Sequence, residues 1–196
     1  MSLCDKCHGK AIIYQKYSGM HLCSSHFEED VHRKVRESLR KTGLFGRGAR
    51  VAFGLSGGNS SSILIYILKN LLGSRKDIDF WAIIIDEEGE NHSQQVQARK
   101  LTERLDIPYV VKKPLTMGEA MQEEAPSPSR MLSDSKMGLL NSTAQEIGAD
   151  ILITGHNLDD ESIAIFINYI RGDVDSFFRL WASKQTPGII PWIKPL

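Results

Sequence analysis

Short apolar runs alternate along most of this chain with stretches whose apolar residues recur at helical spacing. The runs predicted as strands are 51–55, 80–85, 109–111 and 151–154, and the stretches predicted as helices are 63–72, 93–105, 136–147 and 158–171. This alternation predicts an α/β fold, a doubly wound parallel sheet covered by helices on both faces. Ligands of such sheets bind at the carboxyl ends of the strands, so the residues that follow each strand matter most.

The first 48 residues lack this alternation. Phe27, Val31, Val35 and Leu39 are four residues apart and predict one helix over 27–41, with the acidic run 28–30 in its first turn. We therefore predict three parts. They are a small metal-binding finger at 1–27, a helix and linker at 28–48, and the α/β domain at 49–196, with a long surface loop at 117–135 inside it.

All three cysteines of the chain lie in its first 23 residues. Cys4-x-x-Cys7 and Cys23-x-x-His26 are separated by fifteen residues, and Ala11–Tyr14 and Met20–Leu22 resemble a hairpin around Ser18-Gly19. Three thiolates and one imidazole at this spacing can surround Zn²⁺ tetrahedrally, and a closed four-ligand site is normally structural. Buried cysteines with an incidental histidine are the alternative.

A glycine- and serine-rich segment joins the first strand of the α/β domain to the first helix. Glycines let successive backbone N–H groups face one anion, and the helix N-terminus adds its positive dipole end. The predicted phosphate-binding residues follow one another in the chain: Ser56, Gly57, Gly58, Asn59, Ser60 and Ser61. The alternative is a plain strand-to-helix turn in which Ser60 or Ser61 caps the helix.

Two further groups of residues follow predicted strands. Asp86 follows one strand and is a candidate for a ribose or a metal; Gly155 and His156 follow another and are candidates to border a nucleotide. Asp159 or Asp160, with Asp160 preferred, is a candidate Mg²⁺ ligand because hard cations take oxygen ligands. Arg171 is a candidate phosphate clamp. In the alternative, Asn157 caps the helix, and the acids and Arg171 only complement its dipole.

Composition and charge narrow the classes of function. The chain has 196 residues, with 24 basic and 24 acidic side chains, so bulk charge alone does not hold it on a nucleic acid. We see neither a membrane-spanning run nor a signal peptide, which predicts a cytoplasmic protein. Lys136, Arg40, Lys41 and Arg47 are the candidate RNA contacts, although the basic helix face can equally be solvated.

Taken together, these residues resemble the PP-loop ATP pyrophosphatases, and among them the tRNA 2-thiolation enzymes that make 2-thiouridine or 2-thiocytidine. The motifs that carry the resemblance are the Cys4–Phe27 finger, the loop that begins Ser56-Gly57-Gly58, Asp86-Glu87, Gly155–Glu161, Arg171–Asp173 and the closing Ile193–Leu196. The resemblance implies that the protein binds Mg-ATP and adenylates a base carbonyl oxygen of tRNA. Pyrophosphate leaves, and sulfur supplied from elsewhere, such as a sulfur-carrier protein, then displaces AMP. Since members of the family are often dimers, a homodimer is a further expectation.

The chain departs from the family pattern in the phosphate loop. Asn59 and Ser60 stand where the family has Lys and Asp, which removes a cation and a carboxylate and leaves Ser60 and Asp160 as the candidate catalytic residues. The alternative function is therefore a nucleotide-binding pseudoenzyme or a zinc-stabilised interaction module.

A second departure concerns sulfur chemistry. The family's Cys-x-x-Cys pair aligns with Ser129 and Leu132, and no cysteine follows Cys23. We therefore expect no cysteine-ligated iron–sulfur cluster. The early end at Leu196 indicates a short paralogue or an incomplete C-terminus.

Overall fold

The computed structural model describes residues 2–86, 92–113, 136–172 and 190–196. These residues form two compact units, Met1–Gly43 and Leu44–Leu196. The loop predicted at 117–135, with Ser129 and Leu132, lies outside the described residues. Within the described part of the chain, every helix is too short or too polar to cross a bilayer.

The first unit contains a hairpin and one helix. Strands β1 (Ile13–Gln15) and β2 (Met20–Leu22) pair antiparallel, with Tyr14 opposite His21. Gly19 has a φ of 69° in the turn between them, a backbone conformation that favours glycine. The predicted hairpin is therefore confirmed, with its first strand moved toward the turn.

Helix α1 (Ser24–Thr42) follows β2 directly. Cys23 is its N-cap and accepts a backbone hydrogen bond from Phe27 at 2.9 Å. The helix therefore begins three residues earlier than predicted, and the acidic run 28–30 does not lie in its first turn, so that prediction is wrong. The reason is that the Cys23–His26 segment itself makes the first turn of the helix.

The second unit is built on one parallel sheet in the order β5-β4-β3-β6-β7. The strands, in chain order, are β3 (Arg50–Gly54), β4 (Asp79–Ile85), β5 (Tyr109–Lys112), β6 (Ile151–Thr154) and β7 (Trp192–Ile193). The four strands predicted from the apolar runs are confirmed. β7 is an additional edge strand, too short to leave a pattern in the sequence.

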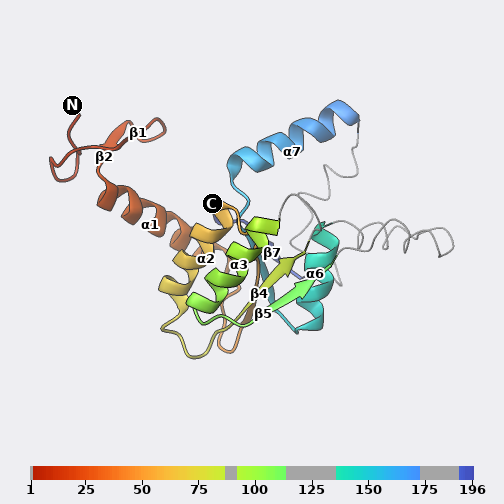
Figure 1. The fold of residues 1–196 in the computed structure, drawn as a ribbon. Coiled ribbons are helices and arrows are strands. Elements are labelled where there is room, and N and C mark those ends of the chain that lie inside the picture. Colours follow the sequence, from red (N-terminus) through yellow and green to blue (C-terminus); the bar gives the residue numbers. More distant parts are fainter. Residues whose placement is uncertain (1, 87–91, 114–135, 173–189) are drawn as a thin grey trace. The chain divides into compact units, whose positions relative to one another are not determined.

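The helices in the described part of the second unit are α2 (Asn59–Leu72), α3 (His92–Arg104), α6 (Lys136–Glu146) and α7 (Leu158–Arg171). The chain moves outward from β3 to β4 and β5, and then returns to β6 on the other side of β3. Because parallel crossovers are right-handed, α2 and α3 lie on one face and α6 on the other, as Figure 1 shows. The predicted doubly wound α/β fold is confirmed.

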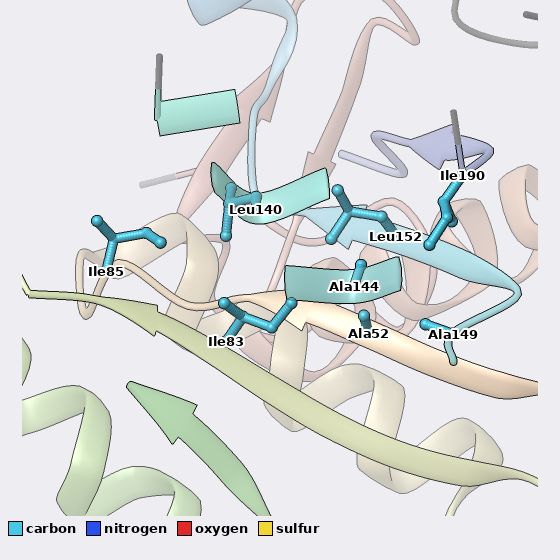
Figure 2. Packing of buried hydrophobic residues seen from close by; sticks show 8 residues of the cluster. All are labelled: Ala52, Ile83, Ile85, Leu140, Ala144, Ala149, Leu152 and Ile190. Carbon is cyan, nitrogen blue, oxygen red and sulfur yellow. The ribbon is translucent and has the colours of Figure 1, made fainter. Parts of the chain in front are cut away.

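The core beneath α6 shows why the sheet holds together. Leu140 and Ala144 of α6 pack on Ala52 of β3, Ile83 of β4 and Leu152 of β6 (Figure 2). All five are at most 6% exposed, so each removes most of its apolar surface from water. Three central strands and one helix are thereby fixed relative to one another, and with them the loops that leave the strands.

Candidate functional site

A pocket of about 530 Å³ opens where the strand order reverses between β3 and β6. At such a switch point the loops that leave two neighbouring strands diverge to opposite faces, and ligands bind between them. The pocket is lined by the segments after both strands and by α3 and α6, including Ser56, Gly58, Asn59, Ser60, Ser61, Gln94, Gln95, Lys136, Met137, Thr154, Gly155, His156 and Asp160. Its size is in the range of small-molecule sites.

The N-terminus of α2 faces this pocket without a side-chain cap. Gly58 is the N-cap residue and has no side chain to accept a hydrogen bond, so the cap by Ser60 or Ser61 that the alternative required is not what the structure shows. The first backbone N–H groups of a helix lack intrahelical partners. Those of Asn59 and Ser60, which line the pocket, are therefore placed to bind an anion.

Hydroxyl groups close the base of this loop. The Ser56 and Ser61 hydroxyls lie 2.9 Å apart, and Ser61 also donates to the carbonyl of Gly58 at 3.1 Å. The backbone N–H of Gly58 donates to Ser56 Oγ at 3.3 Å. The loop is thus held in shape by its own side chains, so its donors are arranged before any ligand binds.

Two glycines are required by close approach of the backbone. Gly57 has a φ of 80°, and a Cβ there would lie 1.9 Å from the carbonyl oxygen of Gln94. A Cβ on Gly155 would lie 2.6 Å from Cα of Ser61. The first glycine packs the phosphate loop against α3, and the second packs the end of β6 against α2. Together they bring three segments to one pocket.

The N-terminus of α7 differs from that of α2 because its own side chains cap it. Asn157 accepts hydrogen bonds from the backbone N–H groups of Asp159 and Asp160 at 2.9 and 3.1 Å, and Asp160 accepts one from Asn157 at 2.9 Å. The structure thus shows the cap by Asn157 that the alternative interpretation described. Asp160 also lines the pocket, so its carboxylate takes part in the cap and faces the candidate ligand site.

His156 follows β6 and lines the pocket. Its Nδ1 is 2.9 Å from the hydroxyl of Thr154, which also accepts a hydrogen bond from the indole N–H of Trp192 at 2.7 Å. Burial lowers the pKa of His156 below its ordinary value, and the nearby positive charge of Lys194 lowers it further. The imidazole is therefore neutral at neutral pH.

Eight of the eleven predicted nucleotide-binding residues line the pocket, and Gly57, Asp86 and Arg171 do not. Gly57 packs the loop against α3 instead. Asp86, at the end of β4, forms an ion pair with Arg99 at 3.5 Å and is not among the lining residues. Arg171 is the last residue of α7, eleven residues and about 16 Å along the helix axis from Asp160. Neither side chain is placed to contact a ligand between β3 and β6.

Other residues have different positions from those the sequence suggested. Lys136, predicted as an RNA contact, is the first residue of α6 and lines the pocket. Gln94 and Gln95 were not predicted; the only signal for them is that they follow β4, at the same edge of the sheet. Arg40 and Lys41, at the end of α1, and Arg47 are exposed to solvent.

The four residues predicted as metal ligands lie together in the first unit. Ligand atoms of Cys4, Cys7, Cys23 and His26 all lie within 4.8 Å of one another. The Cys7 and Cys23 sulfurs are 3.7 Å apart, and His26 Nδ1 is 3.4 and 3.3 Å from the sulfurs of Cys4 and Cys23. Four soft and borderline donors converging in this way fit a bound metal.

The thiol of Cys4 has a lowered pKa, which favours its metal-binding thiolate form. Its burial would raise its pKa, but hydrogen bonds from backbone groups of Cys23, Lys6 and Cys7 outweigh burial and lower the pKa to about 6. A thiolate is the form of cysteine that ligates metals.

Comparison with known families covers both units. The model "2-thiouridine synthetase TtuA, N-terminal LIM domain" matches residues 3–28, and the model "PP-loop domain" matches residues 27–196. The second match includes the sheet and the pocket, and the first includes the four candidate metal ligands.

Individual proteins similar to this chain include two that are named for the thiolation of tRNA. The chain is 34% identical to "tRNA 2-thiolation protein NcsA" of Haloferax volcanii over 98% of its own length and 67% of the relative's. It is 28% identical to "tRNA-5-methyluridine(54) 2-sulfurtransferase" of Thermotoga maritima over 98% of its own length and 65% of the relative's. The chain thus spans about two thirds of the length of these curated relatives.

A solved structure agrees in fold. The "U34-tRNA thiolase NcsA from Methanococcus maripaludis with its [4Fe-4S] cluster" superposes with a TM-score of 0.83 at 30% identity. The superposition covers 100% of this chain and 67% of the other.

The prediction that no cysteine-ligated iron–sulfur cluster occurs is wrong, and that structure corrects it. A relative similar to the whole of this chain contains a [4Fe-4S] cluster. The prediction assumed that three cysteines held together must hold zinc. Thiolates ligate iron–sulfur clusters as well as single ions, so the three thiols of the Cys4–His26 site are no ground for excluding iron.

Proposed function

This chain belongs to the PP-loop family, and from that premise we propose that it binds Mg-ATP and adenylates a carbonyl oxygen of a tRNA base during 2-thiolation. The observation that carries the proposal is the uncapped N-terminus of α2, which opens into a pocket at the switch point of the sheet. The relatives named as tRNA 2-thiolation proteins support tRNA as the substrate.

The phosphate chain of ATP would lie against the α2 N-terminus. The backbone N–H groups of Asn59 and Ser60 and the nearby serine hydroxyls are donors for its oxygens. Lys136 lines the same pocket from α6 and supplies a positive charge, which the loop itself lacks. Leu55, Ile83 and Ile85 provide apolar lining suited to the nucleoside.

The reaction follows from the chemistry of a carbonyl oxygen, which is a poor leaving group. The base oxygen attacks the α-phosphorus, the α–β phosphoanhydride bond breaks, and pyrophosphate departs with the negative charge that the loop donors stabilise. A sulfur donor then bonds to the base carbon, and the carbon–oxygen bond breaks to release AMP. The sulfur comes from a separate donor, for which a sulfur-carrier protein is our candidate.

Mg²⁺ would be held by the carboxylate of Asp160. One of its oxygens accepts the N–H of Asn157, and the other has no hydrogen-bond partner among the described residues, so it remains for a hard cation. When bound, Mg²⁺ neutralises phosphate charge and favours departure of pyrophosphate.

The relatives named "Cytoplasmic tRNA 2-thiolation protein 1" support a cytoplasmic location.

A second candidate function is nucleotide binding without turnover. It is favoured by the two uncharged side chains, Asn59 and Ser60, at the positions where the family loop has Lys and Asp. The two functions use the same pocket, so they differ in turnover and not in the fold.

The deciding experiment measures AMP and pyrophosphate released from Mg-ATP by this chain, with and without bulk tRNA, together with ATP binding by calorimetry. Release of AMP that depends on tRNA supports adenylation. Binding without AMP supports the second function, and neither binding nor AMP contradicts both. The double variant Asn59→Lys with Ser60→Asp separates them further, because turnover gained only in the variant shows that the wild-type loop is inactive.

A further inference from the structure

A continuous contact runs from the last strand of the sheet to the nucleotide pocket. Leu152 of β6 pairs with Trp192 of β7, and Thr154 lies two residues beyond Leu152, on the same face of β6. The indole N–H of Trp192 reaches the Thr154 hydroxyl at 2.7 Å, and that hydroxyl lies 2.9 Å from Nδ1 of His156. His156 in turn lines the pocket beside the phosphate loop.

The direction of these hydrogen bonds follows from the groups involved. An indole N–H only donates, so the Thr154 oxygen is the acceptor in its bond with Trp192. Thr154 is 2% exposed, and a buried hydroxyl proton needs an acceptor. Nδ1 of His156 is the acceptor in reach among the described residues, so Thr154 donates to it and the ring proton belongs on Nε2.

The indole itself is fixed from three sides. Besides its N–H bond, it carries the ammonium of Lys194 over its face at 3.8 Å and meets the His156 ring edge-on, with centroids 5.8 Å apart. Lys194 also forms an ion pair with Glu161 in the first turn of α7. These contacts tie β7 to the segment between β6 and α7 that carries His156.

We propose that Thr154 and Trp192 are positioning residues of the pocket, which hold His156 as the tautomer protonated on Nε2 and so make it a fixed hydrogen-bond donor to a phosphate oxygen of the nucleotide. The donor role rests on the proposed function, because it requires a nucleotide in the pocket. The tautomer does not, since it is a property of the protein alone.

The charges around His156 agree with a neutral ring. Lys194 and Lys136 disfavour its protonation, Asp160 and Glu161 favour it, and burial is the largest influence and lowers its pKa. A neutral imidazole has one N–H, and which nitrogen carries it is set by the partner of the other nitrogen. The hydrogen-bonded series Trp192–Thr154–His156, called the relay below, therefore determines which nitrogen of His156 donates a hydrogen bond in the pocket.

The first test reads the tautomer directly. In protein labelled with ¹⁵N-histidine at pH 8, two-bond proton–nitrogen correlations distinguish the protonated from the unprotonated ring nitrogen, and His156→Gln assigns the signal among the six histidines. We expect one tautomer with the proton on Nε2. A wild-type ring protonated on Nδ1 overturns the proposal.

Variants test the relay. Thr154→Val removes the hydroxyl at constant shape and Trp192→Phe removes the indole N–H, so both should give a mixture of tautomers, whereas Thr154→Ser should retain the wild-type spectrum. Thr102→Val is the matched control, because Thr102 is also buried but donates to backbone carbonyls of α3. Unchanged spectra in both Thr154→Val and Trp192→Phe overturn the relay.

ATP affinity, measured by calorimetry, tests the positioning role. Thr154→Val should weaken binding by about three- to tenfold, the effect of one poorly placed hydrogen bond, and Thr154→Ser and Thr102→Val should bind as wild type does. Unchanged affinity in a folded Thr154→Val overturns the donor role. If wild type binds no ATP, the proposed function fails, and the tautomer measurements still decide whether the relay exists.

Discussion

At the scale of single residues, the pocket depends on glycines whose absence of a side chain is required by tertiary contacts. Gly57 has a positive φ and touches the backbone of Gln94, far along the chain in α3. Gly148 also has a positive φ, of 67°, but a Cβ there would meet no atom closer than 3.6 Å. A side chain at Gly57 would therefore introduce both backbone strain and a steric clash, whereas a side chain at Gly148 would introduce backbone strain alone.

We predict that Gly57→Ala destabilises the second unit by roughly 3 kcal/mol or more, because strain and a clash with a backbone oxygen add together. Gly148→Ala, which introduces only the strain, should cost about 1–2 kcal/mol. Urea unfolding of both variants measures the difference. Equal losses would show that the contact with Gln94 is not restrictive.

A second prediction at this scale concerns pH. The pKa of His156 is lower in the folded protein than its ordinary value of 6.5, so the unfolded chain binds the proton more tightly. The contribution of His156 to stability is therefore complete above pH 6.5 and declines as the pH falls below that value.

His156→Gln should reduce this acid dependence. The check is the free energy of unfolding of wild type and variant at pH 8 and pH 5.5, because the difference between the two proteins removes the effect of the other histidines. The same slope in both would contradict burial of a neutral ring.

At the scale of elements, α2 and α7 show how one kind of helix terminus serves two purposes. The N-terminus of α7 is closed by the capping box of Asn157 and Asp160, whereas that of α2 begins at a glycine and keeps its N–H groups for a ligand. Both follow central strands, so the difference in their cap residues decides which terminus has N–H groups available for an anion.

The hairpin and α1 of the first unit are joined by a buried carboxylate. Asp30 of α1 accepts hydrogen bonds from Gln15 at 3.0 Å and Tyr17 at 2.9 Å, and pairs with Arg33 at 2.5 Å. Burial would raise its pKa, but these hydrogen bonds outweigh burial and hold the pKa well below its usual range. The charged form of Asp30 is therefore the one that binds the hairpin to the helix.

We predict that Asp30→Asn destabilises the first unit by about 2 kcal/mol, because the amide can accept fewer of these bonds and leaves its donors unsatisfied. Thermal unfolding followed by the tyrosine signals of this unit measures the loss. Glu29→Gln, a neutralised neighbour on the exposed side of α1, is the matched control and should change little.

At the scale of the whole molecule, the candidate metal site and the pocket lie in different units. The first contains the four candidate metal ligands, and the second contains the pocket. The candidate ligand Cys4 is fully buried, and the other buried apolar residues described in this unit are Leu22, Val35 and Leu39. A metal bound by Cys4 would therefore contribute much of the stability of this small unit.

We predict that removal of the metal unfolds residues 1–43 and leaves the sheet of the second unit intact, because that sheet has its own core. Amide proton–nitrogen spectra before and after chelation measure which signals collapse, and iron, zinc and acid-labile sulfide analysis of the released material identifies the group. Cys7→Ser should reproduce the loss, and Ser2→Ala should not. Collapse of the β3 and β6 signals would contradict independent units.

The sequence by itself determined the helices and the four longer strands of the sheet. Strands 51–55, 80–85 and 151–154 are so apolar that burial on both faces is their stable state. The helix predicted at 158–171 has the same bounds as α7. The cysteine spacing likewise identified the four candidate metal ligands, since Cys-x-x-Cys and Cys-x-x-His each bring two donors together within one local turn. These features are local, so neighbouring residues carry the information.

Only the tertiary structure decided which candidates share a site. Lys136 and Gln94 join the phosphate loop because separate helices begin at one edge of the sheet, while Asp86 and Arg171, equally plausible in the sequence, do not reach it. The link from Trp192 through Thr154 to His156 depends on the pairing of β6 with β7, across 38 residues. Such contacts are set by packing and strand order, which no local pattern encodes.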